Sequence, residues 1–164
     1  MGTAKKLRKK YNTPSHMWEK DRIVEEKQLL AEYGLKNKKE IWIMDSKLSQ
    51  FKNLAKNAIS SRTTQSEKET QELLTKLKSL GFLDDSSVLS DVLTLSIKDI
   101  LERRLQTVVL RKGLARSINQ ARQFITHHHI KVNGKTISSP AYMVKKSEED
   151  QITIDDILYI GQTP

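Results

Sequence analysis

The chain has 164 residues and a formal net charge of +9, a length that suits one or two small domains and a charge that favours a polyanionic partner. The charge is uneven, because residues 1–50 carry +5, residues 51–100 carry 0 and residues 101–164 carry +4. The absence of cysteine excludes disulfides and thiolate zinc sites, and no apolar run reaches the roughly 20 residues that cross a membrane, so we expect no membrane partner.

Residues 1–20 combine cations with aromatic side chains and lack the apolar periodicity of a packed core. A basic tail of this kind is usually solvated, but aromatic side chains that alternate with cations can stack on bases or ribose. Because a second basic region follows later in the chain, we interpret residues 1–20 as an arm that becomes ordered on RNA. The candidate RNA contacts in the arm are Lys5, Lys6, Arg8, Lys9, Lys10, Tyr11, His16 and Trp18.

Residues 21–95 have the periodicity of a helical subdomain, with helices expected at 22–33, 41–59 and 67–80. Gly34 is suited to end the first helix, and the basic linker behind it contributes Lys38 and Lys39 as candidate RNA contacts. Apolar side chains recur on one face of the second helix, and we expect them in the core rather than around a cofactor. They are Ile41, Met44, Leu48, Phe51, Leu54, Ala55, Ala58 and Ile59.

Residues 103–146 contain ten Lys or Arg and no Asp or Glu, a pattern expected of a surface that binds a polyanion. A helix is expected from Ser96, a good N-cap, to a stop at Gly113. Its apolar stripe runs through positions 97, 100, 101, 105 and 108, so the polar side chains off this stripe are expected to project outward. These candidate RNA contacts are Arg103, Arg104, Thr107 and Arg111.

A second helix is expected directly afterwards, because Ser117 and Gln120 form the S-x-x-Q pattern of a capping box. Positions 118, 121 and 125 face inward, so the polar side chains around them line a second outward face. The candidate RNA contacts here are Arg116, Ser117, Asn119, Gln120, Arg122 and Gln123.

After residue 129 an alternating apolar pattern replaces the helical period, and Asn133-Gly134 is typical of a type I′ hairpin turn. The return strand is expected to begin at Thr136, with further short strands at 142–144 and 151–154 and a solvated acidic turn at 148–150. Lys131, Asn133 and Lys135 are candidate RNA contacts. The predicted fold class is α+β: a helical subdomain at residues 21–95, then a C-terminal module at residues 96–160 in which two helices pack on a short, twisted, mostly antiparallel sheet.

Little in the sequence suggests catalysis. His127, His128 and His129 are consecutive, and neighbouring residues of an extended segment point to opposite sides, so they cannot grip one metal ion together. We instead treat His127 and His128 as candidate RNA contacts. The acidic pairs at 84–85 and 155–156 have no neighbouring nucleophile or histidine. We therefore expect no enzyme activity, no metal, no cofactor and no small-molecule substrate.

The order of these motifs resembles a known RNA-binding module. The segment RKGLARSINQARQFITHHHIKVNGK (111–135), with ERRLQTVV before it and SSPAYMV after it, is similar to the module named after small-subunit ribosomal protein S-four. In that family the arginines of the first helix, the Ser/Arg start of the second helix and the loop before VNG contact structured RNA. Pseudouridine synthases, a tyrosyl-tRNA synthetase and a heat-shock ribosome-rescue protein carry the module too, so the flanking segments must decide between them.

The flanking segments resemble the archaeal and eukaryotic branch of the S-four family. Two features match this branch: the N-terminal order of basic cluster, Tyr11, Thr13-Pro14, His16 and Trp18, and the segment YGLKNKKEIW (33–42). The resemblance implies a non-catalytic constituent of the small subunit of cytoplasmic ribosomes that binds ribosomal RNA directly and nucleates assembly of the subunit body. It also implies neighbouring small-subunit ribosomal proteins as partners, and mRNA near the channel through which it enters as a further partner to test. The alternative is a stand-alone ribosome-associated stress or rescue factor with the same module.

Overall fold

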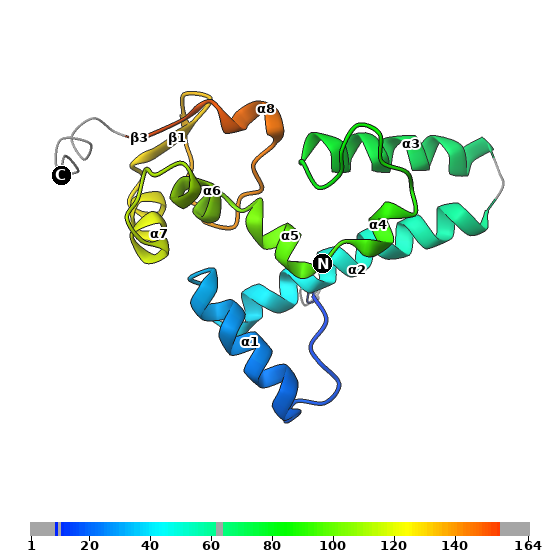
Figure 1. Ribbon diagram of the computed structural model, residues 1–164, viewed down its shortest axis with the longest axis horizontal. Helices are drawn as coiled ribbons and strands as arrows, with labels where there is room; N and C mark the ends of the chain where they lie inside the picture. Colours follow the sequence, from blue (N-terminus) through cyan, green and yellow to red (C-terminus); the bar gives the residue numbers. More distant parts are fainter. Residues whose placement is uncertain (1–8, 10, 62–63, 155–164) are drawn as a thin grey trace, which may run out of the picture.

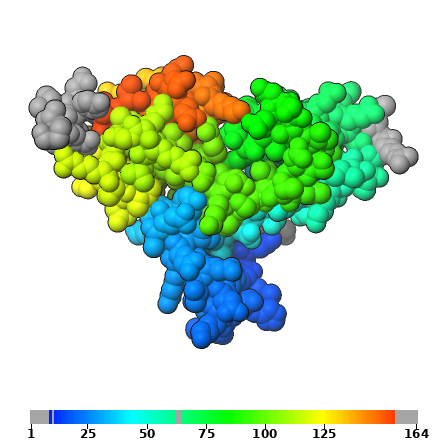
Figure 2. Space-filling model, in the orientation of Figure 1, coloured from blue at the N-terminus to red at the C-terminus, as the bar shows by residue number. Residues whose placement is uncertain are grey.

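The computed structural model describes residues 9, 11–61 and 64–154 (Figure 1). Helices from the first part of the chain lie beside a small unit of helices and strands from the second part, and α1 (Lys20–Glu32) projects away from both (Figures 1 and 2). The α+β class expected from the sequence is confirmed.

The helical part is built around one long helix, α2 (Lys38–Ser60). Asn37 begins this helix by accepting a hydrogen bond from the Glu40 N–H at 3.3 Å. Helix α3 (Thr64–Ser79) runs back beside α2, while α1, α4 (Asp91–Thr94) and α5 (Ile97–Glu102) also pack on it (Figure 1). The three helices expected between residues 22 and 80 are therefore confirmed, with ends that differ by a few residues.

A first apolar core lies between these helices. It contains Tyr33, Leu35, Ile41, Met44, Leu48, Ala55, Leu73, Leu77, Leu83, Val92, Leu95, Ile100 and Leu101. Two core positions expected on α2 are wrong, because Leu54 is 51% exposed and Ile59 is 52% exposed. Leu54 lies about 100° around the helix from the buried Ala55, and Ile59 lies in the last turn, beyond the end of the buried stripe.

The single helix expected from Ser96 to the stop at Gly113 is interrupted. Ser96 does begin α5 with a capping box, but Arg104 takes an extended conformation with φ −71° and ψ 142°, and α6 (Leu105–Arg111) starts after it. Arg104 pairs with Met143 in an isolated antiparallel bridge, flanked by hydrogen bonds from Leu105 N–H to Tyr142 O and from Val144 N–H to Arg103 O. The backbone N–H of Leu105 and the carbonyl of Arg103 therefore bond to the chain near residue 143, instead of to the helical partners that a continuous helix would offer.

The C-terminal module packs α6 and α7 (Ile118–Thr126) against each other and against three short strands. The sheet order is β2 (Lys135–Thr136), β1 (Ile130–Val132), β3 (Ile152–Ile154), and β1 is antiparallel to both neighbours. A second apolar core fills the module. Its members are Leu105, Val108, Val109, Ala115, Ala121, Phe124, Ile125, Ile130, Val132, Val144 and Ile152.

The hairpin prediction is confirmed, because Asn133 and Gly134 have φ values of 52° and 72°, as a type I′ turn requires. Two neighbouring predictions are wrong. Segment 142–144 makes only the bridge at Met143 instead of a strand, and residues expected in a solvated turn form α8 (Lys146–Glu149). Glu148 in α8 is buried and accepts a hydrogen bond from the Tyr142 hydroxyl at 2.9 Å, which explains why this acid is not solvated.

The two cores divide the chain at the interruption between α5 and α6. Ile100 and Leu101 belong to the first core, whereas Leu105 is the first member of the second core. Helix α5 therefore packs with the helical part, and the Arg103–Arg104 segment connects the two parts of the molecule.

Candidate nucleic-acid interface

The start of α7 displays polar side chains in a fixed arrangement. The Ser117 hydroxyl accepts a hydrogen bond from the Gln120 N–H at 3.2 Å, and the Gln120 Oε1 accepts one from the Arg116 N–H at 2.7 Å. These two side chains therefore hold the helix start in place. Arg116, Asn119 and Gln123 are exposed, as the sequence predicts.

The hairpin and the loop before it add a second exposed group. Asn133 and Lys135 are exposed, while Lys131 is half-buried on the central strand. His127 and His128 are exposed at the end of α7, and the His127 ring stacks on the His129 ring with centroids 6.3 Å apart. His128 has φ 66°, so the chain turns sharply there before it enters β1.

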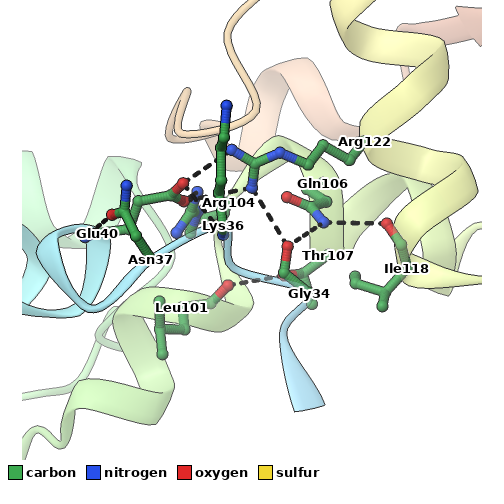
Figure 3. A network of polar contacts seen from close by, with 10 residues as sticks. All are labelled: Gly34, Lys36, Asn37, Glu40, Leu101, Arg104, Gln106, Thr107, Ile118 and Arg122. Atoms are coloured by element: carbon green, nitrogen blue, oxygen red, sulfur yellow. Dashed lines mark hydrogen bonds and ion pairs between the residues drawn. The ribbon is translucent and has the colours of Figure 1, made fainter. Parts of the chain in front are cut away.

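Arg104 does not project outward as expected. Its side chain is 1% exposed, and its Nη2 donates to Glu40 Oε2 at 2.7 Å (Figure 3). Arg104 lies in the extended link between α5 and α6. Its side chain therefore points between the two parts of the molecule and contacts Glu40 of α2. Arg104 is thus committed to an internal ion pair, and the expectation that it faces solvent is wrong.

Arg122 reaches the same carboxylate from α7. Its Nη2 donates to Glu40 Oε1 at 2.8 Å, and its Nη1 donates to the Gly34 carbonyl at 3.2 Å (Figure 3). The buried Gln106 completes the contact, since its Nε2 donates to the carbonyls of Gly34 and Ile118 at 3.1 and 3.0 Å. The group of Gly34, Glu40, Arg104, Gln106 and Arg122, which we call the Glu40 network, joins the helical part to the C-terminal module.

The electrostatics of this network are governed by Glu40. Burial by itself raises the pKa of the Glu40 carboxyl, but hydrogen bonds and charge from Arg122 and Arg104 outweigh that effect and hold the pKa below its ordinary value. Glu40 is therefore ionised at neutral pH, and its charge compensates the two arginines.

The remaining candidates near α6 also have internal partners. Thr107 is buried and donates its hydroxyl to the Leu101 carbonyl at 2.9 Å, so its expected outward position is wrong. Arg103 pairs with Glu149 at 2.8 Å and is largely buried. Arg111 pairs with Glu102 at 2.8 Å but keeps most of its side chain in solvent, so it alone of these three remains accessible as predicted.

The N-terminal candidates lie along α1 and α2. Lys9, His16, Trp18 and Lys39 are exposed, and Lys39 lies over the half-buried Tyr11 ring at 5.5 Å. Trp18 is 91% exposed, and the loop that displays it is held by Arg22, which donates to the carbonyls of His16 and Met17 at 2.9 and 3.0 Å. Lys38 is half-buried and pairs with Glu26 at 3.0 Å. Candidates Lys5, Lys6, Arg8 and Lys10 lie outside the described residues.

Sequence reasoning missed Glu40 and Gln106. Glu40 lies in the first turn of α2, directly after Lys38 and Lys39, and its partners Arg104 and Arg122 lie 64 and 82 residues further along the chain. Gln106 is similarly joined to Gly34 across 72 residues. Helical and strand periodicity cannot predict contacts between residues so far apart in the sequence. The only sequence feature that pointed to a special role was one acid next to several lysines.

The residues that the structure describes were compared with the requirements of a metal site and of a membrane-spanning helix. No group of three or more His, Cys, Asp or Glu comes together there in a way that could hold a metal ion. None of the helices in residues 9, 11–61 and 64–154 combines the length and the apolar character needed to cross a bilayer.

The chain is similar to one protein family model and to several archaeal ribosomal proteins. The family described as S4 domain matches residues 103–152. Small ribosomal subunit protein uS4 of Ignicoccus hospitalis is 47% identical over 152 residues, which cover 93% of this chain and 92% of the relative. The uS4 protein of Nanoarchaeum equitans is 50% identical over 147 residues, or 88% of this chain and 82% of the relative. That of Methanococcus maripaludis is 46% identical over 165 residues, or 100% of this chain and 90% of the relative.

Proposed function

The chain belongs to the uS4 family of small ribosomal subunit proteins, and from this membership we propose that it is a structural constituent of the small subunit of cytoplasmic ribosomes and binds ribosomal RNA directly. The role is non-enzymatic: RNA is held by shape and phosphate contacts, for which a rigid display of cations and amides is sufficient.

The observation that carries the proposal is how acids are distributed around the C-terminal module. Residues 103–146 contain ten Lys or Arg and no Asp or Glu. Acids from outside this segment pair with those of its arginines that are buried or half-buried. Glu40 forms ion pairs with Arg104 and Arg122, and Glu149 forms one with Arg103. A further set stays exposed, which we call the exposed module set: Arg116, Asn119, Gln123, His127, Asn133 and Lys135. Its net charge is positive, as RNA binding requires.

A stand-alone stress or rescue factor would share only the module with this family. The similarity to uS4 proteins instead extends over 93% of this chain and 92% of the Ignicoccus hospitalis relative, so it includes the helical part as well. This breadth favours the ribosomal constituent over the alternative.

We extend the proposal to assembly. A chain that binds RNA through a basic N-terminal segment and a module at the other end can hold two RNA segments together, and such a contact can nucleate the subunit body. Neighbouring ribosomal proteins, and mRNA near the channel through which it enters, are the further partners of this proposal. Omission of the chain from reconstitution of small subunits from purified components tests it, because the proteins that join the subunit body after it should then fail to assemble.

The direct test of RNA binding uses the full chain and a transcript of small-subunit ribosomal RNA. Arg116→Ala and Lys135→Ala should each weaken binding and reduce the magnitude of the salt dependence by about one unit, because each removes a phosphate contact. Lys68→Ala, on the exposed side of α3, is the matched control and should leave both quantities unchanged. Equal binding by wild type and both variants of the exposed module set would contradict the proposal.

A further inference from the structure

A cavity of about 310 Å³ lies in the angle between α1 and α2. Residues 11–19 run from α2 to the start of α1 (Figure 1), and residues 12–14 of this segment line the cavity. The segment is held on α2, because the Asn12 N–H donates to Ser46 Oγ at 2.9 Å and the Ser46 hydroxyl donates to the Trp42 carbonyl at 2.7 Å. We call this feature the α1–α2 cavity and define it by Glu25, Leu29, Ile41, Trp42, Asp45 and Ile97.

The floor of the α1–α2 cavity is apolar and firmly held. Ile41 is buried, while Leu29, Trp42 and Ile97 are half-buried. The Trp42 indole N–H donates to Glu26 Oε1 at 3.0 Å, which fixes the ring against α1. A ligand would therefore meet a preformed surface, and binding would cost little side-chain ordering.

The mouth of the cavity is acidic. Glu25 and Asp45 are exposed, and neither forms an ion pair within the part of the chain that the structure describes. The other charged groups at the cavity compensate each other, because Arg22 pairs with Glu26, which also pairs with Lys38 at 3.0 Å. Two carboxylates thus remain without a cation on a chain whose net charge is +9. They repel phosphate and attract a positively charged group.

We propose that the α1–α2 cavity receives an arginine side chain from a basic segment of a neighbouring ribosomal protein. The guanidinium would stack on the Trp42 ring and donate hydrogen bonds to Glu25 and Asp45. The methylene stem of the arginine would cover Leu29 and the other apolar side chains of the floor. This inference rests on the proposed function only for the source of the arginine, since the small subunit supplies the neighbouring protein.

The chemistry of the cavity favours arginine over other occupants. RNA would bring phosphates to two uncompensated carboxylates, and an apolar side chain would bury those carboxylates without a partner. Lysine has the charge but lacks the planar head that stacks on an indole and donates to two acceptors. A volume of about 310 Å³ lies at the lower end of the range of about 300–1,000 Å³ for ligand pockets, so it suits one side chain. Proteins that bind RNA are rich in Lys and Arg, so neighbours in a ribosomal subunit can supply the arginine.

The first arm of the test is a titration of the full chain with blocked peptides, followed by heteronuclear NMR of the Trp42 indole N–H. The chain has two tryptophans, and Trp18→Phe identifies the Trp42 signal. Acetyl-Gly-Arg-Gly-amide should shift this signal saturably and should bind at least about threefold more tightly than the Lys peptide, because of the stacking contact. The peptide with citrulline, a neutral analogue of arginine, should not bind measurably.

Charge variants assign the binding to the mouth of the cavity. Glu25→Gln/Asp45→Asn should weaken binding of the Arg peptide about tenfold, because two ionic contacts are lost. Glu32→Gln/Asp85→Asn removes the same charge at exposed positions that do not line the cavity, and it should bind within about twofold of wild type. Both double variants should bind a small-subunit ribosomal RNA transcript at least as tightly as wild type.

The second arm identifies the occupant in small subunits reconstituted from purified components. The chain has no cysteine, so Thr13→Cys, at an exposed residue that lines the cavity, provides a single thiol for a benzophenone cross-linker. We expect a cross-link to an arginine-containing peptide of another ribosomal protein, and Glu25→Gln/Asp45→Asn should reduce its yield.

The outcomes separate this inference from the proposed function. Absence of a shift with the Arg peptide, equal binding of the citrulline peptide, or equal loss in the two double variants would overturn the inference and leave the proposed function intact. A cross-link to RNA or to residues 1–8 of the chain itself, or no cross-link at all, would overturn it as well. Failure of wild type to bind the transcript would instead refute the proposed function, and with it the proposed source of the arginine.

Discussion

Glu40 accepts hydrogen bonds from Arg104 and Arg122, so one carboxylate neutralises two of the cations that helical periodicity assigns to the surface. A buried ion pair contributes little compared with a well-packed apolar contact, but it is costly to break because one charge is left buried without its partner. Substitution of Arg104 should therefore act on stability, whereas substitution of the exposed Arg116 should act on RNA binding.

Glu40→Gln tests this assignment. It leaves Arg104 buried without an opposite charge, so the free energy of unfolding should fall by about 3 kcal/mol. Urea denaturation followed by circular dichroism measures the change. The control is Glu32→Gln, at an exposed position of α1, which should stay within about 0.5 kcal/mol of wild type. A loss at Glu40 as small as that of the control would show that the Glu40 network does not stabilise the fold.

The pH dependence of stability gives a second test at the same residue. The folded-state pKa of Glu40 lies below its ordinary value of 4.5, so the unfolded chain takes up the proton first as pH falls. The stability from ionised Glu40 is therefore complete well above pH 4.5 and is lost as pH falls below that value toward the folded-state pKa. The difference in unfolding free energy between wild type and Glu40→Gln should be constant near pH 7 and should shrink below pH 4.5. A difference that stays constant down to pH 3 would contradict the assignment.

At the scale of elements, local sequence was sufficient for most helices and for the hairpin. The apolar stripe of α2, the Ser117 cap of α7 and the Asn133-Gly134 turn all have signals within a few residues. The interruption between α5 and α6 has no such signal. It depends on the bridge between Arg104 and Met143, and a residue so distant in the sequence leaves no trace in helical periodicity.

The hairpin element can be tested at Gly134. This residue has φ +72°, and a Cβ built there would meet no atom within 4 Å, so a substitution is opposed by backbone strain alone. Gly134→Val should lower the free energy of unfolding by about 1–3 kcal/mol, because a β-branched residue resists positive φ. Thermal melting of the full chain measures this, with Thr136→Val in the exposed return strand as the control. An unchanged melting temperature for Gly134→Val would show that the turn does not constrain the module.

At the scale of the whole molecule, two apolar cores are joined by the link at Arg103–Arg104 and by the Glu40 network. The sequence predicts that a helical part precedes an RNA-binding module, since both periodicities and the basic segment 103–146 are local properties. It does not predict how the two parts are joined, because the network unites Gly34, Glu40, Gln106 and Arg122 from distant parts of the chain (Figure 3). Which cations face solvent follows from that junction, and so the candidate RNA contacts could be predicted only in part.

The claim that the chain is a constituent of the small ribosomal subunit that binds its RNA directly is tested most directly by competition between RNAs. The purified full chain is bound to a labelled transcript of small-subunit ribosomal RNA, and unlabelled small-subunit or large-subunit RNA is added at a fixed salt concentration, since affinity for RNA depends strongly on salt. We predict saturable binding of one protein per transcript, displaced by small-subunit RNA at a concentration at least about a hundredfold lower than that of large-subunit RNA, since specific nucleic-acid binding commonly exceeds non-specific binding by about a thousandfold or more. Equal displacement by the two RNAs would contradict the account.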